Sequence, residues 1–274
     1  MEKYAVIGNP INHSLSPSMH NAAFRSEERD ANYEAIQVSV EAFDAEIAHL
    51  LAGDFNGFNV TVPFKERIIP HLDELSPFAK RCGAVNTVIK ADGKWLGDNT
   101  DGAGFMEGLH EIKAVTSEDR ILIIGAGGAS KAIYLALADA SPQQLVIANR
   151  TVEKAAAMVQ KTHEAWSLAK AEKYLADFTI IIQTTSIGLP ASKNETPIQL
   201  TNLQAGTVVV DIIYNPAETA FLKQAKTKGA VIQNGLPMFS GQGALAYQRW
   251  TGHMPNLEVM KKKLLEELGG QSSL

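Results

Sequence analysis

The sequence predicts an α/β protein of two domains, and two observations indicate this class. Short apolar runs that favour strands alternate almost throughout with segments of helical periodicity. In the second half these runs are continuously apolar, as at residues 121–124, which is typical of parallel strands that helices cover on both faces. The 274 residues suffice for two such domains, and no repeat or low-complexity linker interrupts them.

In the first half, turn and capping residues set the limits of the expected elements. Ser16 and Pro17 favour a helix start, with serine as the N-cap and proline at the first helical position. Gly53 stands where a helix ends, and Asp92-Gly93 between two strand-like runs predicts a hairpin. The expected strands cover residues 4–8, 33–38, 57–62, 84–90 and 94–96, and the expected helices begin at Ser16 and cover 42–51, 65–72 and 77–81.

A second unit begins near Asp101 and repeats the alternation. Its expected strands cover residues 121–124, 145–148, 178–182 and 207–210, and its expected helices cover 104–110, 129–138 and a segment from Thr151. Two further helices, at 237–250 and 257–268, form the tail. Helical periodicity does not decide which of the two domains this tail joins.

Composition excludes several classes of protein. The chain has 25 basic and 30 acidic residues, a net charge of −5, and no basic cluster of the kind that binds nucleic acid. Cys82 is the only cysteine, so an internal disulfide is impossible, and we expect it to be a small buried side chain. No apolar run resembles a membrane span or a secretion signal, so we expect a cytoplasmic protein. No metal-ligand spacing occurs, and no helix shows a clear oligomerisation seam, so both monomer and homodimer stay open.

A glycine-rich turn follows the first apolar strand of the second unit. Residues 125–130 read Gly-Ala-Gly-Gly-Ala-Ser between a buried strand and a helix, the context in which such a turn binds a dinucleotide. Its glycines allow a tight turn and close approach of a pyrophosphate to the helix start. Ser130 replaces the third glycine, and we expect it in the first helical turn, close to phosphate. The complete strand–turn–helix–strand unit disfavours the alternative of a plain tight turn and predicts a doubly wound, Rossmann-type domain.

The residues after the next strand indicate which dinucleotide is bound. An NAD enzyme usually has Asp or Glu there, to bind the ribose 2′-hydroxyl. This chain has Asn149, Arg150 and Thr151, with Lys154 one turn later. A guanidinium neutralises a 2′-phosphate while amide and hydroxyl groups donate hydrogen bonds, so NADP is favoured over the alternative of a solvated helix start.

Polar side chains gather in the first half where a plain core would be apolar. Asn59 and Thr61 point to one face of their strand by its period of two, and Lys65 follows just beyond it. The other members of this polar set are Ser14, Ser16, Asn86 and Asp101. Hydroxyls, amides, one ammonium and one carboxylate together suit a polyhydroxylated acid as substrate. A surface lysine and a capping aspartate are common features by themselves, and the surrounding motifs favour the catalytic interpretation.

These motifs, in this order along nearly the whole chain, resemble the shikimate dehydrogenase family. The resemblance also rests on residues 99–102, Tyr214 and Gln242. It implies an NADP-dependent oxidoreductase that reduces 3-dehydroshikimate to shikimate in aromatic amino acid biosynthesis. It further implies a substrate domain of residues 1–100, completed by the C-terminal helices 237–274, and an NADP-binding domain of residues 101–236.

The resemblance implies a role for each residue of the site. Lys65 and Asp101 would be the catalytic pair, and Lys65 would act either as a proton donor or as a stabilising ammonium, two possibilities that the sequence leaves open. The substrate would contact Ser14, Ser16, Asn59, Thr61, Lys65, Asn86, Asp101, Tyr214 and Gln242. The cofactor would contact Gly125, Ala126, Gly127, Gly128, Ala129, Asn149, Arg150, Thr151, Lys154, Ile212 and Gly235.

Two other readings of the function remain. A broader quinate/shikimate dehydrogenase has the same fold, but Ser14 and Ser16 favour the shikimate-specific enzyme, and the missing acid after the second strand disfavours NAD. A non-catalytic NADP-binding regulatory protein is the other alternative. It would not require Lys65 together with Asp101.

Overall fold

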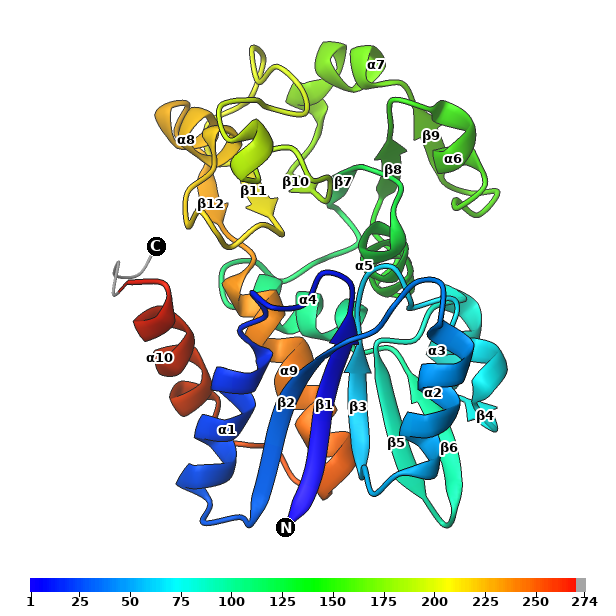
Figure 1. The fold of residues 1–274 in the computed structure, drawn as a ribbon. Helices are drawn as coiled ribbons and strands as arrows, with labels where there is room; N and C mark the ends of the chain where they lie inside the picture. Colours follow the sequence, from blue (N-terminus) through cyan, green and yellow to red (C-terminus); the bar gives the residue numbers. More distant parts are fainter. Residues whose placement is uncertain (270–274) are drawn as a thin grey trace. The chain divides into compact units, whose positions relative to one another are not determined.

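The structure, a computed structural model, describes residues 1–269 and divides them into two compact units. The first unit contains residues 1–104 and the described residues from Ser240 onward, and the second contains Phe105–Phe239. Both boundaries fall inside helices, namely α4 (Asp101–His110) and α9 (Leu236–Thr251). Strands and helices alternate through both units, which confirms the predicted α/β class (Figure 1).

The first unit is built on a six-stranded mixed sheet. Its strand order is β2-β1-β3-β5-β6-β4, with β1, β2 and β3 parallel and β5 antiparallel to its neighbours β3 and β6 (Figure 1). The predicted Asp92-Gly93 hairpin joins β5 to β6. The strands are β1 (Glu2–Gly8), β2 (Ala31–Gln37), β3 (Gly57–Val60), β4 (Glu74–Leu75), β5 (Thr87–Ala91) and β6 (Lys94–Asp98).

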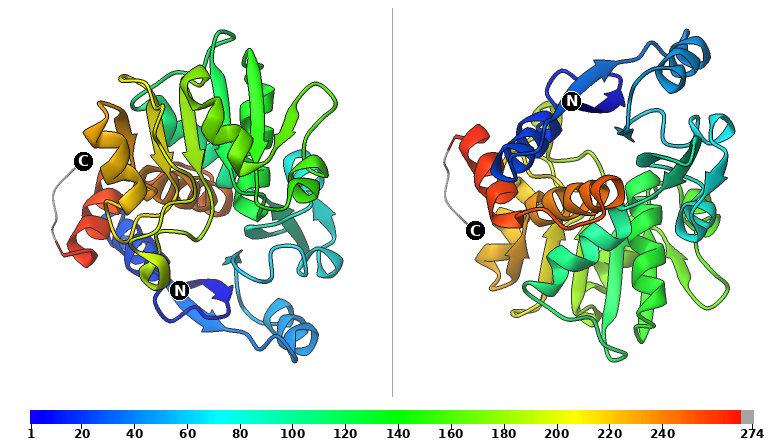
Figure 2. Two further views of the ribbon diagram at one scale, coloured as in Figure 1. Left: turned by 90° about the horizontal axis from the view of Figure 1, so that it is seen from above. Right: turned by 90° about the horizontal axis from the view of Figure 1, so that it is seen from below.

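Helices cover the two faces of this sheet with different side chains. On one face, α2 (Phe43–Ala52) packs aliphatic and phenylalanine side chains against Ala5 and Ile7 of β1. On the other face, Tyr4 of β1 stacks on Phe24 of α1 (Ser16–Ser26) and on Trp250 of α9. The last helix, α10 (Leu257–Glu267), lies along α1, so the described C-terminal helices complete the first unit (Figures 1 and 2).

The second unit is a fully parallel sheet in the order β12-β11-β10-β7-β8-β9. If β7 is counted as the first strand of this sheet, the order read from β9 to β12 is 3-2-1-4-5-6, that of a doubly wound fold. The strand order changes direction between β7 and β10. The strands are β7 (Arg120–Ile124), β8 (Gln144–Ala148), β9 (Glu164–Trp166), β10 (Ile180–Gln183), β11 (Val208–Asp211) and β12 (Val231–Gln233). The helices are α5 (Gly128–Asp139), α6 (Val152–Ala156), α7 (Leu168–Lys173) and α8 (Ala220–Thr227).

The prediction of a helix at residues 65–72 is wrong. The segment forms turns and one short 3₁₀ helix, Ile69–His71. Pro70 has no backbone N–H to donate to Glu66, so a regular helix cannot continue through it. The helix expected at 77–81 is present as α3 (Pro77–Cys82), where the Ser76 hydroxyl accepts a hydrogen bond from Ala79 N and Gly83 ends the helix with φ of 63°.

Within residues 1–269, no helix is both long enough and apolar enough to cross a membrane.

His20 of α1 lies in the aromatic layer and has no polar partner. Its ring is fully buried and stacks on Tyr33 at 4.4 Å between centroids with an interplanar angle of 9°. Neither ring nitrogen makes a hydrogen bond to any described residue. Burial lowers the pKa of His20 to about 3, so the ring is neutral in the folded protein at ordinary pH.

The His20→Phe variant should therefore resist acid better than the parent chain. In the unfolded chain His20 takes up a proton below its ordinary pKa of 6.5, but in the folded chain it does so only near pH 3. Stability is thus lost as the pH falls between these values, by about 1.4 kcal/mol per pH unit from this group. Phenylalanine keeps the stacked ring without the titration. Urea unfolding at pH 7, 5.5 and 4.5 checks this, and a constant difference between the two proteins would contradict it.

Candidate active site

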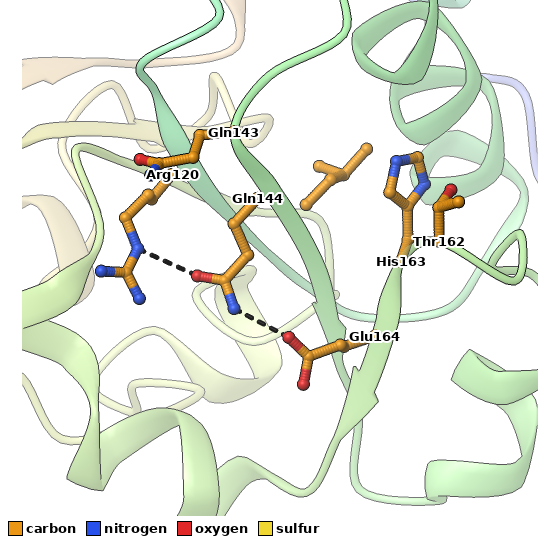
Figure 3. A pocket seen from close by; sticks show the side chains of 7 residues that line it. Arg120, Gln143, Gln144, Thr162, His163 and Glu164 are labelled. Atoms are coloured by element: carbon orange, nitrogen blue, oxygen red, sulfur yellow. Dashed lines mark hydrogen bonds between the residues drawn. The ribbon is translucent and has the colours of Figure 1, made fainter.

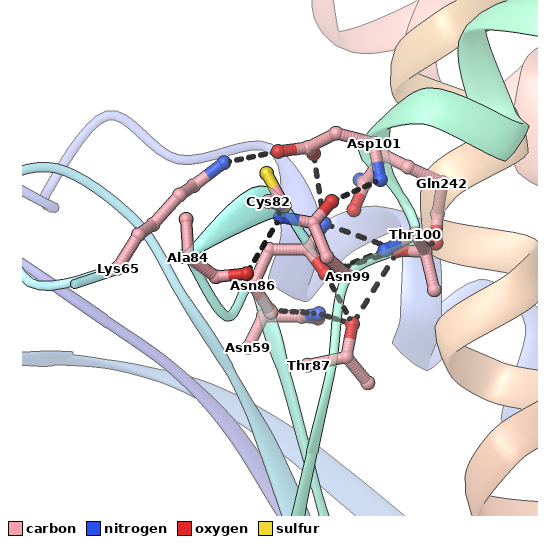
Figure 4. A network of polar contacts seen from close by, with 10 residues as sticks. All are labelled: Asn59, Lys65, Cys82, Ala84, Asn86, Thr87, Asn99, Thr100, Asp101 and Gln242. Atoms are coloured by element: carbon pink, nitrogen blue, oxygen red, sulfur yellow. Dashed lines mark hydrogen bonds and ion pairs between the residues drawn. The ribbon is translucent and has the colours of Figure 1, made fainter. Parts of the chain in front are cut away.

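A short ion pair lies at the centre of the polar residues of the first unit. Lys65 Nζ is 2.5 Å from Asp101 Oδ2, and the two side chains are 21% and 8% exposed (Figure 4). Lys65 follows β3 in the turn segment, and Asp101 is the first residue of α4, where its carboxylate suits the positive end of the helix. Among residues 1–269, only Asp101 accepts a hydrogen bond from the ammonium, so Lys65 keeps two N–H groups for a ligand.

Asn86 holds the Asp101 carboxylate from the other side. Its Nδ2 donates to Asp101 Oδ1 at 2.7 Å and to Thr100 Oγ1 at 3.1 Å. Its Oδ1 accepts from Thr100 N at 2.9 Å and from Thr87 Oγ1 at 2.8 Å (Figure 4). Both amide protons and both lone pairs of Asn86 are therefore in use, which leaves one orientation of the amide. The carboxylate faces Lys65 with one oxygen and Asn86 with the other.

A second layer of hydrogen bonds fixes the start of α4. Asn99 Oδ1 accepts from Asp101 N, and Asn99 N in turn donates to Asp98 Oδ1. Asp98 also accepts hydrogen bonds from the Ser76 hydroxyl at 2.5 Å and from Arg249 Nε at 2.8 Å. Burial acts to raise the pKa of Asp98, but these donors outweigh it and hold the pKa below its usual value. The ionised Asp98 anchors the loop that carries Asp101.

Asn59 of β3 joins this network from the sheet. Its Nδ2 donates to Asn86 O at 3.0 Å and to Thr87 Oγ1 at 3.2 Å, and its Oδ1 accepts from Tyr33 OH at 2.7 Å. Both of its N–H groups are used within the protein, so Asn59 offers a ligand only the remaining acceptor capacity of Oδ1.

The other predicted substrate residues of the first unit lie on neighbouring elements. Ser14 Oγ accepts from Ser16 N at 3.3 Å at the start of α1, and Ser16 is 6% exposed. Thr61 follows β3, where its methyl group would lie 2.6 Å from a Cβ at Gly8. Gln242 lies on α9, and its carbonyl accepts from Thr100 Oγ1 at 3.0 Å (Figure 4). The Lys65, Asn59, Asn86, Asp101 and Gln242 segments are thus brought together in one unit.

The glycine turn of the second unit leaves room for a phosphate. Gly125 has φ of 112°, and a Cβ there would lie 2.6 Å from Thr184 Oγ1, so glycine is required. At Gly127 and Gly128 a Cβ would meet nothing described within 4 Å, and α5 begins there without a side-chain cap. An open approach to uncapped helical N–H groups is what a dinucleotide pyrophosphate requires, so these residues fit the cofactor.

Ser130 lies in the first turn of α5, as predicted, and it is fully buried. Its hydroxyl donates to Gly125 O at 2.7 Å. It closes the turn by a hydrogen bond that the usual third glycine cannot make.

The basic residues after β8 are exposed and unpaired. Asn149 Nδ2 donates to Thr151 O at 2.8 Å, which shapes the loop before α6. Arg150, Thr151 and Lys154 are exposed, and over the described part of the chain no carboxylate pairs with the Arg150 guanidinium or the Lys154 ammonium. Two unneutralised cations at the end of this strand suit a 2′-phosphate.

The ends of β10 and β11 carry a buried network that the sequence analysis missed. Asp211 accepts from Ile213 N at 3.0 Å and from Thr219 Oγ1 at 2.7 Å, and Gln183 Nε2 lies 3.4 Å from the same carboxylate. Burial raises the pKa of Asp211 to about 6, against the lowering effect of these donors. A signal was available, because each of these residues is the polar end of a three-residue run of Val or Ile.

This network lies next to the two residues expected at the nicotinamide end. Gly235 is packed so closely that a Cβ would lie 1.9 Å from Ile212 O, which brings Gly235 and Ile212 together. Tyr214 packs against Phe239 in the same unit, with tilted rings 4.9 Å apart between centroids, and burial raises the pKa of Tyr214. The structure thus groups Ile212, Gly235 and Tyr214 within the second unit.

A hollow of about 410 Å³ lies at the amino ends of β7, β8 and β9 (Figure 3). Three of its polar side chains are engaged with one another, since Arg120 Nε donates to Gln144 Oε1 and Gln144 Nε2 donates to Glu164 Oε1. Ligands of doubly wound sheets bind at the opposite, carboxyl edge.

Within residues 1–269 no three His, Cys, Asp or Glu side chains gather closely enough to hold a metal ion.

The fold and these residues define a class. A doubly wound parallel sheet, a glycine turn and a lysine–carboxylate pair among buried amides are the parts of a dinucleotide-dependent dehydrogenase acting on a polar substrate. Three family models match the chain: the shikimate dehydrogenase substrate binding domain over residues 6–88, shikimate/quinate 5-dehydrogenase over 108–221, and the shikimate 5'-dehydrogenase C-terminal domain over 235–265.

Individual relatives agree with the family models. A shikimate dehydrogenase (NADP(+)) of Bacillus anthracis is 51% identical over 97% of this chain and 99% of its own. A shikimate 5-dehydrogenase of Thermus thermophilus, solved with NADP(H) and shikimate, has a TM-score of 0.89 at 36% identity and covers 97% and 99% of the two chains. A quinate dehydrogenase of Corynebacterium glutamicum, solved with NAD, has a TM-score of 0.90 at 29% identity and covers 97% and 99%.

The chain belongs to the shikimate dehydrogenase family. This confirms the predicted family.

The Asp211→Asn variant should change how stability depends on pH. The Asp211 carboxyl has a pKa of about 6 in the folded chain against its ordinary value of 3.8. Between these values the folded chain holds a proton that the unfolded chain has lost, so the parent chain loses stability as the pH rises. The loss from this group reaches about 3 kcal/mol above pH 6. Asparagine is isosteric and does not titrate.

Urea unfolding of both proteins from pH 4.5 to 7 measures the effect. We expect the parent chain to lose stability relative to the variant as the pH rises. A difference in unfolding free energy that is independent of pH would show that Asp211 does not titrate in this range.

Proposed function

We propose that this chain catalyses the reversible, NADPH-dependent reduction of 3-dehydroshikimate to shikimate, with Lys65 and Asp101 as its catalytic pair. The enzyme class and the cofactor are those of the family, as the sequence predicted. The observation that carries the residue roles is the 2.5 Å pair of Lys65 and Asp101, held by amides whose own hydrogen bonds are filled.

The pair suits the reduction of a carbonyl group. Bound NADPH supplies the hydride, and the carbonyl oxygen becomes negatively charged as it is reduced. Lys65 has two free N–H groups with which to bind that oxygen, and the ammonium either donates a proton to it or stabilises its charge. Asp101 holds Lys65 in place with one oxygen while Asn86 fixes the other.

The remaining polar residues would bind and orient the substrate. Ser14 and Ser16, at the start of α1, would donate hydroxyl groups to the substrate carboxylate, with Tyr214 at the same end. Thr61, Asn59, Asn86, Asp101 and Gln242 would contact the ring hydroxyls. Asn59 would accept a hydrogen bond from a ring hydroxyl, because both of its N–H groups are used within the protein. Asn86 would have to replace one of its hydrogen bonds within the protein by one to the substrate.

The second unit would hold the cofactor. The pyrophosphate would lie against the turn Gly125–Ala129, where Gly127 and Gly128 are open. Arg150, with Asn149, Thr151 and Lys154, would bind the 2′-phosphate, and Ile212 with Gly235 would contact the nicotinamide. The predicted domain limits, residues 1–100 with 237–274 for the substrate and residues 101–236 for NADP, remain our proposal, with Asp101 belonging to the compact unit of the substrate domain. Residues 270–274 lie outside the described residues. We further propose that the protein is cytoplasmic and is a monomer or a homodimer. The single cysteine, which cannot form an internal disulfide, supports the cytoplasmic location.

The main alternative is a dehydrogenase that also accepts quinate. A quinate dehydrogenase with NAD shares the fold at 29% identity, so the fold alone does not separate the two substrates. The exposed, unpaired Arg150 and Lys154 favour NADP over NAD, and the two serines at 14 and 16 favour shikimate. Assays with shikimate and quinate, each with NADP and NAD, test this directly. Equal activity with quinate and NAD would favour the alternative.

Lys65→Ala should lower kcat by about 10²–10⁴-fold, because the variant loses the group that protonates or stabilises the oxygen. The KM for shikimate should change little. Initial rates of NADP reduction by shikimate measure both constants. Lys90→Ala, which removes an exposed lysine of the same unit, is the control and should be neutral. A large rise in KM with kcat preserved would mean that Lys65 serves binding alone.

The Arg150→Ala substitution should weaken the binding of NADPH far more than the binding of NADH. The guanidinium is proposed to bind only the 2′-phosphate, and a charged hydrogen bond of this kind contributes about 1.5–3 kcal/mol, or roughly ten- to a hundredfold in affinity. Titration of the protein with each cofactor gives the two dissociation constants. An equal loss for both cofactors would place Arg150 elsewhere on the dinucleotide. Lys193→Ala, an exposed cation of the same unit for which no partner is described, is the matched control.

A further inference from the structure

Tyr33 is a buried tyrosine that none of the proposed roles uses. It lies on β2, the edge strand of the first sheet, and is 1% exposed. Its hydroxyl donates to Asn59 Oδ1 at 2.7 Å, although Asn59 is on β3 and the strand β1 lies between them. The side chain of Tyr33 therefore crosses one strand to reach an amide of the candidate site.

The Ser16 side chain also acts on this hydroxyl. Burial raises the pKa of Tyr33 well above its usual value, and hydrogen bonding by Ser16 acts to lower it. Ser16 is assigned to the substrate carboxylate and Asn59 to the ring hydroxyls. One phenol group thus connects residues proposed for two different ends of the substrate.

The position of Tyr33 is fixed at both its backbone and its ring. Asn21 of α1 donates to Tyr33 O at 2.7 Å and accepts from Tyr33 N at 2.9 Å. The ring stacks on His20 at 4.4 Å with an angle of 9°, and Trp250 lies 6.0 Å away. A ring held in this way presents its hydroxyl in one direction, which is the condition for orienting a neighbouring amide.

Tyr33 also decides what Asn59 offers to a ligand. The Asn59 Nδ2 is fully used by Asn86 O and Thr87 Oγ1, so only Oδ1 has capacity left. Tyr33 donates to that oxygen and so fills one of its two lone pairs. Without the phenol, the amide loses the contact that holds its oxygen toward the site.

We propose that Tyr33 is a positioning residue for substrate binding, which acts by fixing the Asn59 amide. This inference rests on the proposed function, because it uses the substrate role of Asn59. It predicts that the phenol matters for binding of substrate and not for the chemical step, since neither Lys65 nor Asp101 contacts it within the described structure.

The Tyr33→Phe variant tests this against a matched control. Tyr4 pairs with Tyr33 across β1 and β2 and is 2% exposed, but its hydroxyl donates to Glu2 instead. Tyr33→Phe should raise the KM for shikimate about three- to tenfold, the range expected for one hydrogen bond, with kcat and the KM for NADP within about twofold. Tyr4→Phe should leave all three constants unchanged.

Two further measurements separate positioning from a loss of folding. Thermal unfolding should show both variants folded at the assay temperature, so that the KM difference between them is not a stability effect. The effect of Tyr33→Phe on KM should also shrink in an Asn59→Ala background, because Tyr33 acts through Asn59. Fully additive effects, or equal KM for Tyr33→Phe and Tyr4→Phe, would overturn the proposal. Turnover of shikimate by the unmodified chain tests the proposed function separately.

Discussion

The geometry of the candidate site depends on the side chain of Asn86. The hydrogen bonds of this amide join β5, the loop before α4 and the Asp101 carboxylate. An amide with all its capacity filled cannot rotate without losing buried hydrogen bonds, each loss costing about 1–3 kcal/mol. Asp101 is therefore held in one orientation before any ligand arrives, and Lys65 is held through Asp101. Asn59, Thr87 and Asp98 extend the same constraint outward to the sheet and to α9.

The two units use opposite means to prepare for their ligands. The first unit fills its polar groups with one another, so that a substrate bound as proposed would use spare capacity on Lys65 and Asn59 or replace a bond of Asn86. In the second unit, by contrast, the space beside Gly127 and Gly128 is open. The Arg150 guanidinium has no partner among the described residues. A dinucleotide brings its own charge and many hydrogen-bond acceptors, so an open site suits it. A small polyol requires orientation, which the filled network provides.

Sequence patterns predicted the features that depend on local order. The apolar runs identified most of the strands, and the glycine turn and the basic segment after β8 are visible directly in the chain. The helix expected at 65–72 failed because Pro70 interrupts it, a local signal that the periodicity outweighed. The hydrogen bond of the Ser130 hydroxyl and the contact of Tyr33 with Asn59 were not predicted, since the direction of a hydroxyl and a contact across an intervening strand are set by tertiary packing. Asp211 and Gln183 were visible as polar ends of apolar strands, but their partners were not.

The helix α9 contributes its first residues to the second unit and its remainder to the first. This division has a consequence for synthesis on the ribosome. Residues 1–104 are translated before residues 105–239, yet the aromatic face of their sheet lacks Tyr247 and Trp250 until α9 has been translated. The second unit is one continuous stretch, Phe105–Phe239, and is complete earlier. Until α9 has been translated, the contacts that Tyr4 and Tyr33 make with Trp250 in the folded protein cannot form, so this face is completed by residues distant in the sequence.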